Sequence, residues 1–175
     1  MRNLALALAL ATTPLLAGCG LHPLYAGGSH AAVAQGLADV EVPAIPGQKG
    51  WLMRNALVDR LHPGGAGEGN KRYRLDVRLD DKLEGLGLLA NDTVGRERRT
   101  LRARYQLVDT TNGDILMDAT AGADAGIDVV SSEYATVAAE QTALENLTRM
   151  VADRITTALA VRLRQNKDSQ PKDAQ

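Results

Sequence analysis

The fold is decided by the stretch YRLDVRLD (residues 73–80), in which apolar and charged residues alternate at every step. In an extended strand, successive side chains point to opposite faces, so the apolar residues share one face and the charged residues the other. This pattern predicts a strand with one buried and one wet face. Strand character continues into GLGLL (residues 85–89), where the glycines predict a β-bulge.

Two more strands are expected downstream. The segment NDTVG (residues 91–95) is typical of a turn or loop, and an alternating strand follows it over Leu101–Leu107. The segment TNGD (residues 111–114) then predicts a hairpin, because Asn-Gly tolerates the positive φ angles of tight turns. Its partner strand is expected from Ile115 to about Ala121.

A strand and two helices complete the expected order of elements. The alternation in ADVEVPAI (residues 38–45) predicts a first strand, which Pro43 assigns to the edge of the sheet. Helical spacing of leucines predicts a helix over Gln48–Leu61, ended by HPGGAG (residues 62–67). A long last helix, capped by Ser131 or Ser132, is expected to end near Arg164. Its apolar stripe comprises Val137, Leu144, Leu147, Val151, Ile155 and Leu159.

This order predicts an α+β, two-layer sandwich: a small, mostly antiparallel sheet with two helices packed on one face. The domain is expected to span residues 38–165, after a linker that follows Cys19 and extends to residue 37. Residues 166–175 are polar and are expected to be a disordered tail. With four Tyr, one Trp and no Phe, the core must consist mainly of aliphatic residues.

The first eighteen residues are expected to be a signal peptide. The apolar run from Leu4 to Ala11 is far shorter than the roughly 20 residues that span a bilayer. It is followed by Leu16-Ala17-Gly18-Cys19, which resembles the bacterial lipobox. That resemblance implies cleavage before Cys19 and lipidation at its thiol and new amine, and Gly20 favours the outer membrane. The alternative is an ordinary signal peptide followed by a free or buried thiol.

Composition excludes several classes of protein. The formal net charge of −1 does not indicate a nucleic-acid-binding protein. A single cysteine rules out an internal disulfide. No later stretch is long and apolar enough to cross a membrane, so the lipid is the only expected anchor.

Several motifs of the chain, taken in order, resemble the LPS-assembly lipoprotein family LptE, in its alphaproteobacterial form. They are CGLHPLY (19–25), IPGQ (45–48), MRNAL (53–57), YRL (73–75), LRARYQL (101–107) preceded by Arg98 and Arg99, Gly113, and SEYA (132–135). The Gly-rich segment after the first helix and residues 83–89 depart from the family pattern. The resemblance implies a protein without catalytic activity. It also implies a complex with the LptD-like LPS-translocation β-barrel of the outer membrane, as plug and assembly aid, and contact with passing lipopolysaccharide.

The densest positive cluster supplies the candidate LPS-binding residues Arg96, Arg98 and Arg99, expected at the loop end of a strand. An arginine fork matches the phosphates of lipopolysaccharide bidentately. A second interpretation is a solvated strand face, which we favour for Arg102 and Arg104, and a third is contact with acidic residues of the barrel lumen. Lys71 and Arg72 would join the cluster only if their strands paired suitably.

The remaining candidate residues have simple interpretations. Trp51 is either a partner-facing anchor or a partly buried helix residue, and Tyr105 and Tyr134 are expected in the core. The three histidines lack the paired spacing of a zinc site, and no nucleophile elbow is present, so no metal, cofactor or catalytic residue is predicted. Asp80 and Asp81 fall on opposite strand faces, which weakens them as an acid/base pair.

Two other functions stay open on the sequence. One is a different periplasm-facing binding lipoprotein, such as a secretion-pore pilot or an auxiliary subunit of a lipid-transport ATPase. The other is an anchored hydrolase, which a deep pocket with converging polar groups would support.

Overall fold

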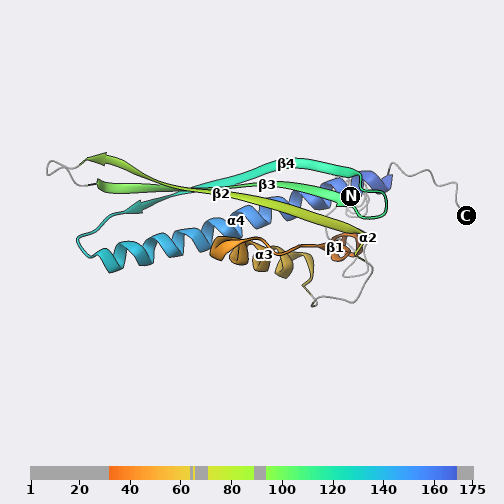
Figure 1. The fold of residues 1–175 in the computed structure, drawn as a ribbon, viewed down its shortest axis with the longest axis horizontal. Coiled ribbons are helices and arrows are strands. Elements are labelled where there is room, and N and C mark those ends of the chain that lie inside the picture. Colours follow the sequence, from red (N-terminus) through yellow and green to blue (C-terminus); the bar gives the residue numbers. More distant parts are fainter. Residues whose placement is uncertain (1–31, 64, 66–70, 89–93, 169–175) are drawn as a thin grey trace, which may run out of the picture.

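The computed structural model describes residues 32–63, 65, 71–88 and 94–168. Figure 1 shows a long twisted sheet above a long helix, with two shorter helices beside it. The described elements, in chain order, are α2 (Ala32–Ala38), β1 (Val40–Glu41), α3 (Gly47–Leu61), β2 (Tyr73–Leu88), β3 (Val94–Asp109), β4 (Ile115–Asp128) and α4 (Glu133–Asp168). The expected signal peptide, Cys19, His22 and His30 lie outside the described residues.

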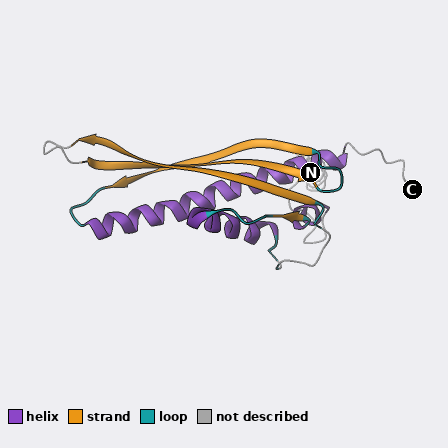
Figure 2. Cartoon of the chain, in the orientation of Figure 1, coloured by secondary structure: helices purple, strands orange, loops and turns teal. Residues whose placement is uncertain are grey.

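The sheet has the strand order β1-β2-β3-β4. The β2–β3 and β3–β4 pairs are antiparallel, and the short β1 pairs parallel with β2 through Val40 and Glu41. Figure 2 shows the helices gathered on one side of the strands. The predicted α+β architecture, with a mostly antiparallel sheet and helices on one face, is therefore confirmed.

The three long strands extend beyond their predicted ends. The β2–β3 ladder runs in a single register from Tyr73 opposite Asp109 to Leu88 opposite Val94. The bulge expected at residues 85–89 is wrong for the paired residues, since Gly85 pairs regularly with Glu97. The one irregularity recorded in these ladders lies between Leu107 and Val108. Residues 94 and 95, expected in a loop, belong to β3.

The β3–β4 connection is the predicted hairpin. Gly113 has a φ of 79°, a left-handed conformation that costs little without a Cβ atom. The N–H of Gly113 donates to the carbonyl of Asp109 at 2.8 Å, and the N–H of Asp109 donates to the carbonyl of Asp114 at 2.9 Å. The turn thus joins the strands where the Asn-Gly pair predicts it.

The first strand is much shorter than expected. Only Val40 and Glu41 pair with β2, because the chain then turns towards α3, where Arg54 Nε donates to the carbonyl of Val42 at 3.1 Å. Its position at the edge of the sheet agrees with the prediction. The linker expected up to residue 37 is wrong for residues 32–37, which form α2.

The two predicted helices are present. α3 begins at Gly47, and Ser132 Oγ accepts a hydrogen bond from the N–H of Ala135 at the start of α4. α4 ends at Asp168 and not near Arg164, so the prediction of disorder is wrong for residues 166–168.

The core lies between α4 and the face of the sheet that carries the odd-numbered residues of β3. Leu101, Tyr105 and Leu107 are buried there, against an α4 stripe of Leu144, Leu147, Val151, Ile155 and Leu159. Met53, Leu57 and Leu61 of α3 close the remaining side. Tyr105 is 3% exposed, which confirms its expected place in the core, and this burial raises the pKa of its hydroxyl. The core is aliphatic, as the composition predicts.

Leu147→Ala should lower the free energy of unfolding by about 2–5 kcal/mol, because it leaves a cavity at a fully buried position. Val137→Ala, on the same helix but 54% exposed, should change it by less than about 1 kcal/mol. Urea denaturation of both variants measures the difference, and equal losses would contradict the described packing of α4.

Candidate functional site

Strand β3 divides the predicted arginine cluster between the two faces of the sheet. Arg96 and Arg98 lie exposed on the face away from the helices, together with Arg102 and Arg104. Arg99 shares the parity of buried Leu101 and Ala103, and therefore points to the helix side. We call the side without helices the open face; it carries the even-numbered residues of β2, β3 and β4.

The open face is a mosaic of charged side chains. Arg104 bonds both carboxylate oxygens of Asp118, at 3.1 and 2.9 Å, and Gln106 donates to the same carboxylate at 2.9 Å. The Arg104 and Gln106 hydrogen bonds lower the pKa of Asp118 from 3.8 to about 2. Arg96 forms an exposed ion pair with Asp128 at 3.2 Å. The face is therefore hydrated and carries both signs of charge.

Two open-face arginines stand apart from these pairs. Within the described residues, neither Arg98 nor Arg102 has a recorded ion pair, and both side chains are exposed. Arg98 lies opposite Glu84 on β2 and Gly126 on β4. The Arg98 side chain is exposed to solvent on this face.

Arg99 has a structural role. Its Nε and one terminal nitrogen donate to the two carboxylate oxygens of Asp81, at 2.9 and 2.8 Å. The other terminal nitrogen donates to the carbonyl of Glu140 on α4 at 2.9 Å, and Lys49 of α3 approaches Asp81 at 3.7 Å. The ion pair is largely buried, with side-chain exposures of 14% for Arg99 and 11% for Asp81. We call Arg99, Asp81, Glu140 and Lys49 the Arg99 latch, since they join α3 and α4 to the sheet.

The latch shifts the titration of both partners. The hydrogen bond from Arg99, with help from Lys49, lowers the pKa of the Asp81 carboxyl, although burial opposes the shift. The hydrogen bond to Asp81 raises the pKa of Arg99. Both groups thus stay charged together, which holds the bidentate pair closed.

Arg96, Arg98 and Arg99 lie within β3, at the end of the strand that follows the loop, as expected. The strand separates Arg99 from the other two, and its side chain is only 14% exposed. The strand alternation places Arg99 on the same side as Leu101 and Ala103, so the sequence contains a signal for its inward orientation. The density of positive charge in residues 96–99 obscures that signal. Asp80 and Asp81 do lie on opposite faces as expected, Asp80 exposed and Asp81 in the latch.

The other candidate residues named from the sequence lie far from this cluster or in different elements. Lys71 and Arg72 lie at the opposite end of the ladder from Arg96, since Arg72 neighbours Thr110 and Asp109. Trp51 is 62% exposed on α3. Tyr134, expected in the core, is 86% exposed, because it lies in the first turn of α4, before the buried stripe of the helix begins.

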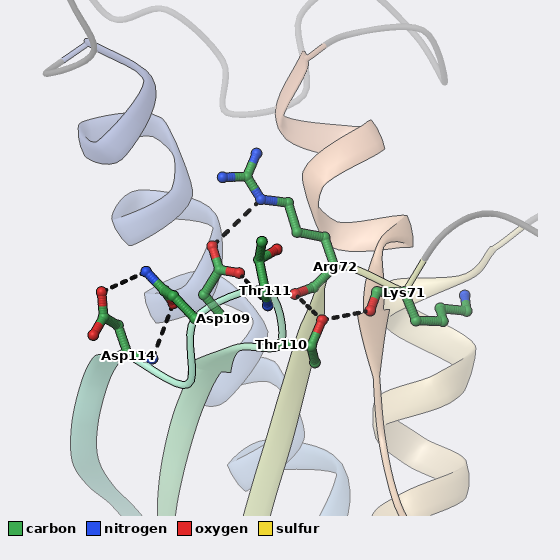
Figure 3. Close-up of polar contacts among 7 residues, drawn as sticks. Lys71, Arg72, Asp109, Thr110, Thr111 and Asp114 are labelled. Atoms are coloured by element: carbon green, nitrogen blue, oxygen red, sulfur yellow. Dashed lines mark hydrogen bonds and ion pairs between the residues drawn. The ribbon is translucent and has the colours of Figure 1, made fainter.

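A polar hollow of about 440 Å³ lies where the β3–β4 hairpin meets α2 and the end of α4. Figure 3 shows Asp109 of this hollow accepting hydrogen bonds from the N–H of Thr111 at 2.9 Å and from Arg72 Nε at 3.4 Å. The Thr111 N–H lowers the pKa of Asp109. Thr110 Oγ1 donates to the carbonyl of Arg72 at 2.8 Å. These groups satisfy one another and fix the turn.

Among the described residues, no group of three or more His, Cys, Asp or Glu side chains converges to hold a metal ion. His62, the one histidine in this part of the chain, is buried and contacts the carbonyl of Ala38 at 3.1 Å. No helix described has the length and apolar character needed to cross a membrane.

Comparison with protein families identifies the fold. The family model described as "LptE: Lipopolysaccharide-assembly" matches residues 37–159, which is most of the domain. The chain belongs to the LptE family. Membership assigns it to the lipoproteins of lipopolysaccharide assembly and outer-membrane biogenesis. No curated protein matches the sequence.

Solved structures support the same fold. A lipoprotein candidate from Caulobacter crescentus CB15 is 26% identical with a TM-score of 0.62, and the match covers 75% of this chain and 96% of that one. The minor lipoprotein of Acinetobacter baumannii is 19% identical, with a TM-score of 0.51 and coverages of 70% and 90%. The rare lipoprotein B of Shewanella oneidensis is 14% identical, with a TM-score of 0.50 and coverages of 73% and 96%. At their low identities, the last two show likeness of fold alone.

Arg99→Ala should lower the free energy of unfolding by about 3 kcal/mol, because it leaves the Asp81 carboxylate buried beside Lys49 only. Arg98→Ala removes the same charge one residue away on the open face and should change it by less than about 0.5 kcal/mol. Chemical denaturation of the two variants compares them. A larger loss of stability for Arg98→Ala than for Arg99→Ala would contradict the assignment of Arg99 to the helix side and of Arg98 to the open face.

Acid should weaken the fold through Asp81. Since its folded-state pKa lies below 3.8, its ionisation stabilises the protein above that value, and this contribution disappears as the pH falls through the lowered pKa. The stability of the native chain should therefore drop from about pH 5 towards pH 3 more steeply than that of Asp81→Asn. Thermal unfolding against pH measures the slopes, and parallel curves would argue against the latch.

Proposed function

We propose that this LptE-family lipoprotein is anchored through lipid on Cys19 in the periplasmic leaflet of the outer membrane and partners the LptD-like LPS-translocation barrel. In this proposal it acts as a plug and assembly aid, and it works by binding, without catalysis. Family membership supports the lipopolysaccharide-related role. The barrel partner rests on the shape and polarity of the sheet.

One observation carries the proposal: the open face is long, hydrated and free of helices. β2 and β3 each extend over 16 residues, which corresponds to roughly 50 Å of strand. The lumen of a large outer-membrane barrel is polar, so an insert must present polar side chains to it. The open face meets that requirement, while the apolar face is already occupied by α4.

Within this proposal, Arg96 and Arg98 present charge to lipopolysaccharide, and Arg99 takes no part. Both side chains are exposed near one end of the open face, and Arg98 has no recorded ion pair among the described residues. Guanidinium groups bind phosphate through paired hydrogen bonds, which suits the phosphates of lipopolysaccharide. No described feature favours a secretion-pore pilot, a lipid-transport subunit or a hydrolase over this function.

The partner is tested by affinity purification of the tagged, lipidated chain from gently solubilised membranes, followed by mass spectrometry. We expect the LPS-translocation barrel in near-equal amount. Cys19→Ala is the control for the anchor and should release the chain from the membrane fraction. Recovery of a secretin or an ATPase complex in place of the barrel would refute the proposed partner.

The lipopolysaccharide contact is tested by direct binding. Arg98→Ala should weaken lipopolysaccharide binding about tenfold, which corresponds to the loss of a charge-assisted hydrogen bond. Arg149→Ala removes an equal charge from the exposed surface of α4 and should leave binding unchanged. Thermophoresis with labelled protein measures both, and equal weakening would mean that only total charge matters.

A further inference from the structure

Strand β2 has a long free edge. β1 pairs only with Tyr73 and Arg74, and no strand pairs with the outer side of the described residues from Leu75 to Leu86. The N–H of Tyr73 donates outward to the carbonyl of Asp39 at 3.1 Å. Since outward groups recur at every second residue of an antiparallel strand, the odd-numbered residues of β2 offer N–H and C=O groups to a further strand.

Side chains of α4 cover the opposite edge of the sheet. On the β2 side, residues 43–46 lie near residues 75–78, and no strand pairs with the described residues beyond them. Arg162 Nε donates to the carbonyl of Leu116 on β4 at 2.8 Å, and Arg154 donates to the carbonyl of Gly122. α4 packs against β3 and β4, and Figure 1 shows β2 on the side of the sheet away from α4 where the strand ends. An unpaired edge of this length is a template for another strand.

The charged side chains of β2 on the open face determine which kind of strand could pair with its free edge. They alternate in sign along the edge, in the order Arg78, Asp80, Lys82 and Glu84. If a second copy of β2 pairs antiparallel about Asp81, Asp80 of each copy lies opposite Lys82 of the other. Arg78 then lies opposite Glu84 in the same way. Opposite charges across strands stabilise pairing, and like charges oppose it.

Neighbouring registers lack this match. Centring the pair on Asp80 places Asp80 opposite its own copy and Arg78 opposite Lys82. Centring it on Lys82 places Lys82 opposite its own copy and Asp80 opposite Glu84. Each of these arrangements sets like charges against one another. The charge pattern therefore favours registers centred on an odd-numbered residue over those centred on Asp80 or Lys82. A pair centred on Leu79 would match charges too, but Asp81 lies nearest the middle of the unpaired edge from Leu75 to Leu86, so the pair centred on it uses more of that edge.

The helix side and the backbone agree with the same register. Leu79 of each copy lies opposite Leu83 of the other, which covers a leucine that is 44% exposed in the single chain. Odd residues meet odd residues, so their outward backbone groups exchange hydrogen bonds directly. The two Asp81 carboxylates meet at the centre, but each is already neutralised by Arg99 and Lys49.

We infer that two copies of this chain associate through their β2 edges, in an antiparallel pair centred on Asp81, to form one continuous sheet. The association is isologous, as a two-fold axis requires. It uses the edge of β2 and not the arginines of the open face, and it concerns the chain outside the barrel, because a chain that fills the lumen as a plug has no second copy beside its β2 edge.

Disulfide trapping in the full-length chain tests the register. Asp80→Cys and Lys82→Cys are placed in two separately tagged copies and expressed together. In the inferred pair these positions are non-hydrogen-bonded neighbours, with Cα atoms about 4.5 Å apart, within reach of a disulfide. We expect a crosslinked species carrying both tags. The wild-type chain and each variant expressed alone are the controls for Cys19 and for random collision. No mixed species, or equal crosslinking in each variant alone, would overturn the inference.

A charge exchange tests the recognition without cysteine. Asp80→Lys should weaken self-association, measured by sedimentation of the full-length lipidated chain, at least about tenfold, because two cross-strand pairs become like-charged. Adding Lys82→Asp in the same chain should restore it. Both side chains are exposed, at 60% and 63%, and form an ion pair with one another at 3.8 Å, so folding should survive. Asp124→Lys on β4 is the matched control and should have no effect. A wild-type chain that stays monomeric, or a double variant that fails to recover, would also overturn the inference.

Discussion

The packing of α4 on the odd-numbered face of β3 is the constraint on which the rest of the structure depends. Leu147, Val151 and Ile155 are fully buried against that face. Because strand residues alternate, burying one face fixes the other as the hydrated one, and a slip of one residue would exchange them. The position of every charged side chain on the sheet follows from this single choice.

The Arg99 latch marks the point where the buried face becomes polar. Beyond Leu101, the odd residues of β3 are Arg99 and Glu97, and their partners on β2 are Leu83 and Gly85. There, a bidentate ion pair with a further hydrogen bond to the Glu140 carbonyl joins α4 to the sheet. The sheet thereby reaches past its core without losing contact with the helices. This extension supplies the length of the open face.

Short-range patterns predict much of this fold. The alternation after Tyr73, the Asn-Gly turn and the stripe of α4 depend on neighbours in sequence, and the structure contains all of them. The ends of the strands were missed because charged and glycine residues there lack the alternation that marks a half-buried strand. The brevity of β1 was missed because a parallel pair with β2 depends on residues far apart in the chain. α2 lies in a segment rich in Gly and Ala, where helical periodicity is weak.

The candidate site was predictable in part. Sequence located the charged residues of β3, and strand parity alone would have separated Arg99 from Arg96 and Arg98. The sequence does not predict the partner of Arg99, because the β2–β3 register decides which carboxylate lies beside it. Val137 shows the same limit, since an apolar residue in a helix stripe is buried only where another element covers it.

The central claim is that the open face of the sheet meets the barrel while the helical side does not. Site-specific photocrosslinking in cells tests it most directly, with a photoreactive residue placed at Arg98 or Arg102 on the open face and at Tyr134 or Val137 on α4. All four side chains are exposed, so each probe should be tolerated. The account predicts crosslinks to the LPS-translocation barrel from the two open-face positions and none from α4. Crosslinks from α4 alone would contradict it.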